Sequence, residues 1–323
     1  MVQGKIRFLM LSRRSLRIKV MQVLYTFEQD REIPFPSLQK QLDKSIDGFY
    51  PMYVFSLWLV VNICRQVNKD AAVKAGKFIK LKEDENYSVR LFHNPIIQKL
   101  VLQKDLFAVV EKEKLNLRFD QDLFRFYFDE LKKIKRYKAY AALEEPTLED
   151  DKAILSILIK NVLWQHEEFH STMEDLFPSW NDDEDTVAFN LIQLVETFDD
   201  QEEQPLKKIK NDYSQEKKFA GELLQKCFYE MSDLENEIEP KLKNWDKERV
   251  ARIDHLLLVM AVAELLYINN IPVKVTLNEY IEIAKQYSTP QSGQFINGIL
   301  DSLVKDYTAA GRMHKSGRGT IDH

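Results

Sequence analysis

The sequence predicts an all-α protein. Nine glycines and ten prolines in 323 residues are few for the many turns of a β-rich chain. No segment alternates apolar and polar residues over the length expected of a half-buried strand, whereas several long segments repeat apolar residues at helical spacing. A hydrophobic content of 45% and a charged content of 30% are ordinary for a globular protein. The length allows about two domains.

The first helix is expected to begin at Ser12, whose hydroxyl can cap a free backbone N–H group. The apolar side chains that should pack recur at helical spacing, and they are Leu16, Val20, Val23 and Phe27. The same helical spacing places Arg14, Arg17 and Tyr25 together on the part of the helix surface next to this apolar stripe. Guanidinium groups beside an aromatic ring can pair with phosphate and stack on unpaired bases. This helix is therefore a candidate RNA surface, and a solvated basic flank is the alternative.

The charge distribution restricts where a polyanion could bind. Residues 1–27 contain six basic residues and no acidic one, although the whole chain has a net charge of -5. Residues 144–203 contain 18 acidic residues and only two lysines. A basic start on an acidic chain favours local binding of a polyanion. We interpret the acidic stretch as a solvated face.

The middle of the chain is expected to be helical. Pro34 and Pro36 interrupt the first helical segment, and further helices are predicted over residues 100–112 and 121–138. The apolar run Met52–Cys64 is 13 residues long, shorter than the roughly 20 that span a bilayer, so it predicts a buried core helix and no membrane partner. Loops are expected at residues 82–86, 144–151, 181–185 and, as a linker, 199–212.

A weak internal repeat covers part of this region. A shift of 65 residues places Asp151–Trp180 over Glu216–Trp245 without a gap, and most apolar positions coincide. Either the middle of the chain holds a diverged copy of a later helical unit, or two amphipathic helices share a period.

The C-terminal third has the clearest pattern. Residues 249–267 predict a central core helix, and Asn269, Asn270 and Pro272 end it. Thr276 and Glu279 have the spacing of a capping box, so a new helix should begin there and end near Tyr287.

The last helix should begin with Thr289 as its cap and Pro290 in its first position. Its first turn carries Gln291, Ser292 and Gln294, and free N–H groups at such a helix start can hold a phosphate. Residues 309–323 contain three glycines and little that could pack, so this tail is expected to be flexible.

The sequence favours a protein without catalytic residues, metal or cofactor. The segment His166–His170 fits the zinc-binding pattern H-E-x-x-H, but Glu168 places a charge inside it and no clear third ligand follows. Glycine-rich nucleotide loops and the G-x-S-x-G elbow do not occur in the sequence. Two cysteines, Cys64 and Cys227, are too few for a disulfide framework and suggest the reducing cytoplasm.

Four sequence stretches resemble the NusB family of transcription antitermination factors. Three lie near the C-terminus, with matching order and spacing: Arg249–Tyr267, Ile271–Lys285 and Phe295–Asp301. The fourth is the first helix, in which Arg13, Arg14 and Arg17 precede the residues Gln22–Tyr25.

The resemblance implies a NusB-like helical bundle with an additional helical insertion. It divides the chain into an arginine-rich first helix (1–33), the insertion (34–212), a C-terminal bundle (213–306) and the tail (307–323). It implies a non-catalytic factor that binds boxA-type leader RNA of ribosomal RNA operons. The implied protein partners are the ribosomal small-subunit protein NusE and the RNA polymerase antitermination complex.

The resemblance also suggests roles for individual residues. It implies RNA contacts at Arg13, Arg14, Arg17, Gln291, Ser292 and Gln294, and it makes Tyr25 and Asp254 candidates for the NusE-facing surface. Gln294 departs from the family pattern, because relatives often carry a basic residue there. A protein-interaction module with a weakened RNA site is therefore the alternative function. An RNA-binding part of an rRNA methyltransferase would require a methyl-donor domain with a glycine-rich loop, which the sequence lacks.

Overall fold

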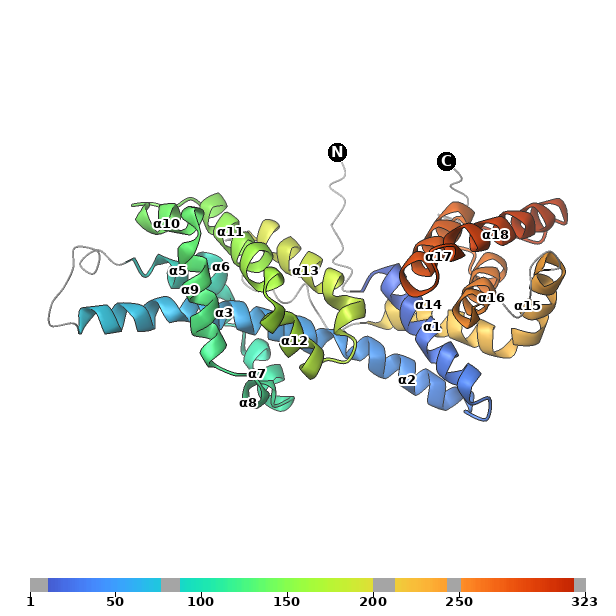
Figure 1. Cartoon of the computed structure of the whole chain (residues 1–323), viewed down its shortest axis with the longest axis horizontal. Coiled ribbons are helices and arrows are strands. Elements are labelled where there is room, and N and C mark those ends of the chain that lie inside the picture. The colour runs from blue at the N-terminus through green and yellow to red at the C-terminus, as the bar shows by residue number, and fades with distance from the viewer. Residues whose placement is uncertain (1–10, 77–87, 200–212, 243–250, 317–323) are drawn as a thin grey trace. The chain divides into compact units, whose positions relative to one another are not determined.

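A computed structural model describes residues 11–76, 88–199, 213–242 and 251–316, and these residues contain helices and no strand. The predicted all-α fold is confirmed. The described residues form two compact units: one comprises residues 47–199, and the other joins residues 11–46 to residues 213–316. Figure 1 labels the helices and colours them from the N-terminus to the C-terminus. We call them the middle unit and the terminal unit.

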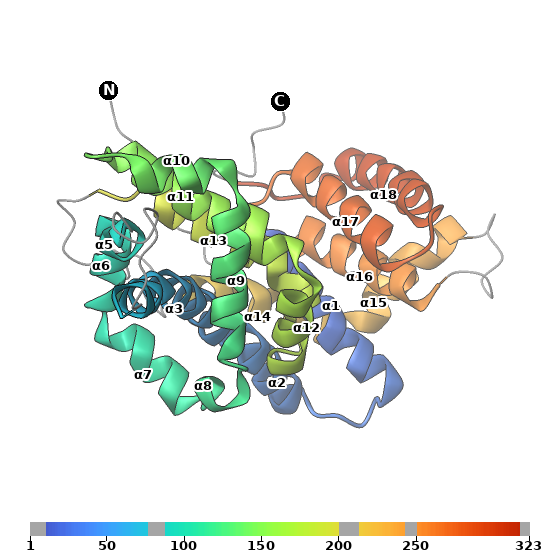
Figure 2. The ribbon, with the colours of Figure 1, turned by 60° about the vertical axis from the view of Figure 1, so that its left-hand side comes forward.

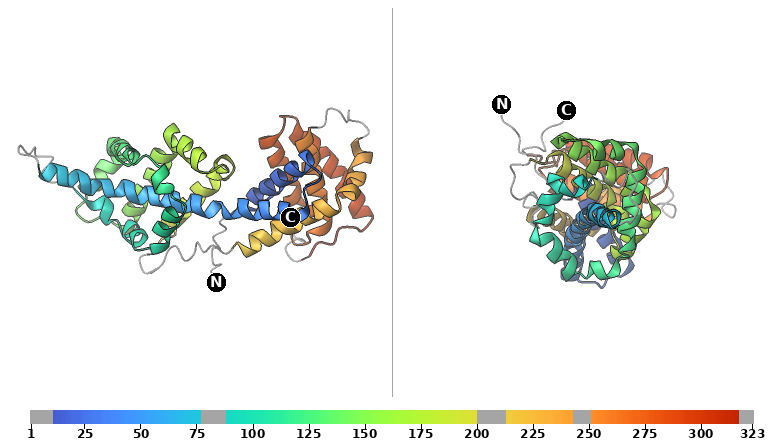
Figure 3. Two further views of the ribbon diagram at one scale, coloured as in Figure 1. Left: turned by 90° about the horizontal axis from the view of Figure 1, so that it is seen from below. Right: turned by 90° about the vertical axis from the view of Figure 1, so that its left-hand side faces the viewer.

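In the terminal unit the other helices surround α16, the helix expected to be central. All ten side chains from Leu256 to Leu265 are buried, and α16 contacts α1, α14, α15, α17 and α18. The left-hand view of Figure 3 shows these helices gathered around it. The helices are α1 (Arg13–Gln29), α2 (Phe35–Asp47), α14 (Ser214–Tyr229), α15 (Met231–Ile238), a 3-10 turn η4 (Glu239–Leu242), α16 (Arg252–Tyr267), α17 (Val273–Tyr287) and α18 (Ser292–Ala309).

In the middle unit the long helix α3 (Phe49–Ala75) has the central place. Figure 2 shows shorter helices packed around it, and it contacts α5, α6, α7, α9 and α13. The shorter elements are α5 (Arg90–His93), α6 (Pro95–Val101), α7 (Lys104–Lys112), α8 (Leu115–Arg118), α9 (Asp122–Lys133), α10 (Lys135–Ala142), α11 (Leu148–Ile157), the π-turn η1 (Leu158–Val162), the 3-10 turn η2 (Leu163–Gln165), α12 (Glu167–Leu176) and α13 (Trp180–Glu196).

The apolar run Met52–Cys64 lies in α3, and nearly all of its side chains are buried, which confirms the predicted core helix. By length and composition the helical stretch Phe35–Ala75 could cross a membrane, but 72% of its most apolar window is buried inside the structure. A core helix accounts for this pattern.

Several predicted boundaries in the middle unit are wrong. Residues 181–185, expected to form a loop, lie inside α13, because Trp180 and Val187 anchor that segment in the core. The helix predicted over 121–138 is interrupted at Ile134, and the one over 100–112 is interrupted at Leu102 and Gln103. Residues 144–147 do form a connection, which ends where Thr147 and Asp150 form a capping box. The predicted loop at 82–86 and most of the linker at 199–212 lie outside the described residues.

The helix break in the two repeat segments falls within one residue of the same position after the 65-residue shift. The first segment breaks between η2 and α12, at His166, and the second breaks between α14 and α15, at Glu230. Most paired apolar positions are buried in both segments, for example Leu158 with Leu223 and Met173 with Ile238. The ancestral duplication itself remains a prediction.

Two expected helix caps in the terminal unit are wrong. Helix α17 begins at Val273, one turn earlier than predicted, and Thr276 is buried inside it with its hydroxyl bonded to Glu264. Glu279 pairs with Arg14 instead of capping a backbone group. Helix α18 begins at Ser292, later than predicted, since Thr289 bonds to the Ser292 side chain instead of starting the helix.

Part of the tail is ordered, contrary to expectation. Arg312 pairs with Glu237 at 2.8 Å, and the Lys315 ammonium donates to the carbonyls of Glu264 (3.2 Å) and Ile268 (3.0 Å). The last carbonyls of a helix lack partners within it and attract cations, so the end of α16 provides the docking site that the tail composition did not reveal. Residues 317–323 lie outside the described part of the chain.

Candidate nucleic-acid interface

The first helix begins as predicted, because the Ser12 hydroxyl accepts a 2.9 Å hydrogen bond from the Ser15 N–H group. Its apolar stripe is buried against the terminal unit. The three arginines that follow Ser12 face different environments, and these environments determine what each can contact.

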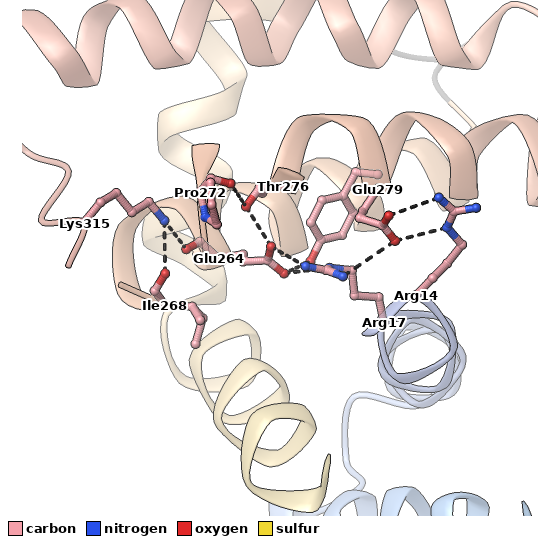
Figure 4. A network of polar contacts seen from close by, with 9 residues as sticks. Arg14, Arg17, Glu264, Ile268, Pro272, Thr276, Glu279 and Lys315 are labelled. Carbon is pink, nitrogen blue, oxygen red and sulfur yellow. Dashed lines mark hydrogen bonds and ion pairs between the residues drawn. The ribbon is translucent and has the colours of Figure 1, made fainter. Parts of the chain in front are cut away.

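Arg17 forms a buried bidentate ion pair with Glu264 of α16. The Arg17 Nε and Nη2 atoms lie 2.8 and 2.7 Å from the two carboxylate oxygens, and both side chains are 0% exposed. Two hydroxyls of α17 complete the site, since Thr276 donates to Glu264 at 2.7 Å and Tyr280 donates at 3.2 Å. Figure 4 shows how this network ties α1, α16 and α17 together around one carboxylate.

The network keeps the guanidinium charged. Burial alone would lower the pKa of Arg17, but the paired Glu264 carboxylate outweighs that effect and raises the pKa above its ordinary value. Burial and the nearby Glu264 charge both raise the pKa of Tyr280, which stays a neutral hydrogen-bond donor. The prediction that Arg17 faces RNA is therefore corrected: its guanidinium is buried and paired with Glu264 inside the protein.

Arg14 is held at the surface by Glu279. Its Nε and Nη2 atoms each lie 3.0 Å from a Glu279 oxygen, and its side chain remains 43% exposed. The hydrogen bond to Glu279 raises the pKa of Arg14. Glu279 also lies 3.7 Å from Arg17, so the surface pair is linked to the buried one, as Figure 4 shows. The edge of the Arg14 guanidinium that does not face Glu279 can contact a phosphate.

Arg13 lines a pocket of about 380 Å³. Its guanidinium stacks 4.1 Å from the centre of the Phe219 ring, which sequence reasoning did not single out. Burial, followed by the neighbouring Arg17 charge, lowers the pKa of Arg13. The pocket is also lined by an exposed aromatic and by amides, namely Tyr267, Asn269 and Asn270. Stacking and amide groups of this kind suit an unpaired base.

The start of α18 presents two of its three predicted residues to solvent. Gln291 and Gln294 are exposed, whereas Ser292 is only 1% exposed and donates a 2.7 Å hydrogen bond to Asp254. The prediction that Ser292 contacts RNA is corrected, because its hydroxyl joins α18 to α16. The partner-facing prediction for Asp254 is corrected for the same reason: its side chain is 5% exposed and lies inside the unit. Tyr25 remains available, with 40% of its surface exposed.

Helix α17 connects the two parts of the candidate interface. Its residue Glu279 holds Arg14, and the Lys285 side chain lies beside Gly293 at the start of α18. Lys285 is exposed and pairs with Glu282 at 2.6 Å. It is a basic residue near Gln294 that sequence reasoning missed, and only the packing of α17 against α18 reveals it. We call Arg13, Arg14, Lys285, Gln291 and Gln294 the terminal-unit surface.

The two histidines of the H-E-x-x-H segment have separate partners. His166 precedes α12 and packs edge-on against Phe126, with ring centres 5.1 Å apart. His170 accepts a hydrogen bond from the Trp180 indole and lies 3.1 Å from Glu184. Among the described residues no three His, Cys, Asp or Glu side chains are grouped as metal ligands.

Comparison with known proteins places part of the chain in a family. Residues 185–305 match the NusB family, and the match begins within α13. Two proteins described as transcription antitermination protein NusB are similar: that of Chloroherpeton thalassium is 42% identical over 106 residues, and that of Salinibacter ruber is 45% identical over 103 residues. These segments cover 33% and 32% of this chain, and 50% and 64% of the relatives.

A third NusB, from Methylacidiphilum infernorum, is 48% identical over 73 residues, which cover 23% of this chain and 51% of the relative. The chain thus spans about half to two thirds of the length of these relatives. A solved chain of T. maritima NusB is 27% identical; the match covers 51% of this chain and 94% of that one, with a TM-score of 0.28. Residues 185–305 are therefore similar to the NusB family, and a long additional helical region precedes them.

Proposed function

We propose that the protein is a non-catalytic, cytoplasmic transcription antitermination factor that binds single-stranded leader RNA of the boxA type. The observation that carries this function is the terminal-unit surface beside the NusB-like segments. Arg14 is positioned there by Glu279, which also lies 3.7 Å from Arg17, and Arg13 is stacked on Phe219. Charged guanidinium groups that are fixed and solvent-facing lose little freedom when they meet a phosphate.

The proposed partners come from the NusB resemblance, and the relatives are described as transcription antitermination proteins. We propose that NusE binds beside the exposed Tyr25 on α1 and that the pair acts within an RNA polymerase antitermination complex. An exposed tyrosine suits a protein interface, because its ring is apolar and its hydroxyl is polar.

Removal of the two exposed arginines should weaken RNA binding. Each phosphate contact on a single strand contributes about 0.7 to the slope of log affinity against log salt, so Arg13→Ala with Arg14→Ala should lower the slope by about 1.4. At 0.1 M salt this corresponds to a loss of roughly 25-fold. The measurement is fluorescence anisotropy of a labelled boxA-like RNA with the full chain, from low to moderate salt.

The control for this experiment removes two exposed lysines of the same unit that lie away from the surface, Lys40→Ala with Lys44→Ala on α2. Equal losses for both double variants would indicate a general charge effect and contradict the assignment. RNA binding that is absent or insensitive to salt, with NusE binding intact, would favour the alternative function.

A basic residue at position 294 should strengthen RNA binding. Gln294 is exposed in the first turn of α18, so Gln294→Lys adds a cation without disturbing the core. One further phosphate contact should steepen the salt slope by about 0.7 and tighten binding about five-fold at 0.1 M salt. Gln225→Lys on the exposed face of α14 makes the same charge change elsewhere. The same anisotropy titration should separate the two variants, and identical affinities would exclude position 294 from the RNA path.

The alternative, a protein-interaction module with a weakened RNA site, is favoured by one observation. Glu279 and Glu282 of α17 lie close enough to Arg14 to act on its charge, and Glu282 also pairs with Lys285. These carboxylates partly neutralise the surface that would meet phosphate, and Gln294 adds no charge to offset them. We retain this function as the second candidate.

A further inference from the structure

The middle unit has a concentrated group of cations where α9 meets α10. Five basic residues occur within the seven positions 132–138, with no acidic residue among them. Figures 1 and 2 both show α10 turning away from the end of α9 at the surface of this unit. The five residues are Lys132, Lys133, Lys135, Arg136 and Lys138.

Two of these cations are neutralised by the protein itself. Lys132 lies 3.1 Å from Asp70 and 2.6 Å from Asp129, and Lys133 pairs with Glu130 at 2.5 Å. Arg125 binds both aspartates as well, at 2.9 and 3.2 Å. Burial opposes the ionisation of Asp129, but hydrogen bonds from Lys132 and Arg125 prevail and lower its pKa. The carboxylates around α9 are therefore already matched by cations of α9.

The other three cations have no such partner. Lys135, Arg136 and Lys138 are exposed, and within the described part of the chain none of them forms an ion pair. The carboxylate that acts on Arg136 is Asp150 of α11, and this aspartate accepts hydrogen bonds from the Thr147 N–H (3.1 Å) and hydroxyl (2.7 Å) groups. We call Lys135, Arg136 and Lys138 the α10 cation cluster.

The position of this cluster in the helix makes its charge less favourable to the fold. The three cations occupy the first four residues of α10, where the first turn contains no acidic residue and Ile134 provides no side-chain cap. Cations at the positive end of a helix dipole are destabilising, so the fold does not require them there. A bound polyanion would offset both the dipole and the mutual repulsion.

We propose that the α10 cation cluster is a second RNA-binding site, which contacts the sugar-phosphate backbone independently of base sequence. The aromatic residues of α10, Tyr137 and Tyr140, are both buried, so no ring is available to stack on a base. A membrane surface fits poorly, because the exposed apolar residues of α10, Ala139 and Ala142, are small, and interfacial helices insert bulky apolar side chains. An acidic protein is the competing ligand and is an outcome of the test.

The test uses the full chain and a labelled 20-nucleotide oligouridine, which has no boxA sequence. Three lost phosphate contacts should reduce the salt slope by about 2, so Lys135→Ala with Arg136→Ala and Lys138→Ala should weaken binding on the order of 100-fold at 0.1 M salt. A matched control removes three exposed lysines of the same unit, Lys104, Lys112 and Lys160, and should change binding far less.

Three results would overturn the second site. They are an unchanged salt slope in the triple variant, equal losses of affinity in the triple variant and the control, or a cluster that binds polyglutamate but not oligouridine.

Circular dichroism of the triple variant checks that the helices persist. A second readout is ultraviolet crosslinking of the RNA, which should label the peptide 135–142 in the unaltered chain. The two proposals are distinguished by repeating the titration in a chain that carries Arg13→Ala and Arg14→Ala. In that chain the α10 triple variant should still reduce the oligouridine salt slope by about 2, because the two sites bind independently.

Discussion

Arg17→Met should lower the free energy of unfolding of the terminal unit by about 3 to 5 kcal/mol. Methionine fills much of the arginine volume but leaves the Glu264 carboxylate buried without its cation, with only the hydroxyls of Thr276 and Tyr280 as donors. An uncompensated buried charge costs far more than the ion pair itself contributes. Since domains are commonly stable by only about 5 to 15 kcal/mol, this one change should remove a large part of the stability.

The two cysteines allow this effect to be measured in the intact chain. Cys227 lies in α14 of the terminal unit and Cys64 lies in α3 of the middle unit, and both are fully buried. Burial raises the pKa of both thiols, which suppresses the reactive thiolate in the folded state. Thiol labelling across a urea series, read by mass spectrometry of the two peptides, therefore reports the unfolding of each unit. Arg17→Met should shift the Cys227 transition to lower urea.

Arg14→Met is the matched control, because it removes the same group from the same helix at a site that is 43% exposed. Exposed ion pairs are worth only about 0 to 1 kcal/mol. Glu264→Gln in the Arg17→Met background should restore much of the loss, since glutamine is neutral, its oxygen can accept from one of the Thr276 and Tyr280 hydroxyls, and its amide can donate to the other. Equal costs for Arg17→Met and Arg14→Met would show that the buried charge is not what makes Arg17 important.

Trp180→Ala should destabilise the middle unit by about 3 to 5 kcal/mol. Trp180 is 0% exposed, packs against Phe169 and Trp164 with ring centres 5.4 and 5.8 Å away, and donates from its indole to His170. Alanine would leave a large cavity and remove the indole hydrogen bond to His170. The Cys64 labelling transition should therefore move to lower urea.

Phe189→Ala in the same helix is the control for Trp180, since Phe189 is 61% exposed and its removal should change stability by less than about 0.5 kcal/mol. A Cys64 transition that responds to neither substitution would mean that α13 unfolds separately from α3. That result would contradict the expectation that α13, which packs against α3, unfolds together with it.

The sequence alone predicted those features that depend on local pattern. The all-α fold, the Ser12 cap, the core helix around residues 256–265 and the buried run in α3 follow from capping chemistry and helical periodicity. The NusB-like segments were recognisable for the same reason, because order and spacing of residue types are written along the chain. The tail was misjudged, since its anchors are distant carbonyls at the end of α16.

The role of each polar residue was decided only by tertiary structure. Arg14 and Arg17 have the same side chain three residues apart on one helix, but packing buries Arg17 against Glu264 and leaves Arg14 beside the exposed edge of Glu279. Thr276 and Glu279 had the spacing of a cap and instead bind residues of α16 and α1. Periodicity specifies which face of a helix is apolar, whereas the partner of a charge depends on which distant helix lies opposite it. Only the folded chain fixes that choice, because a buried charge must find its partner across the core.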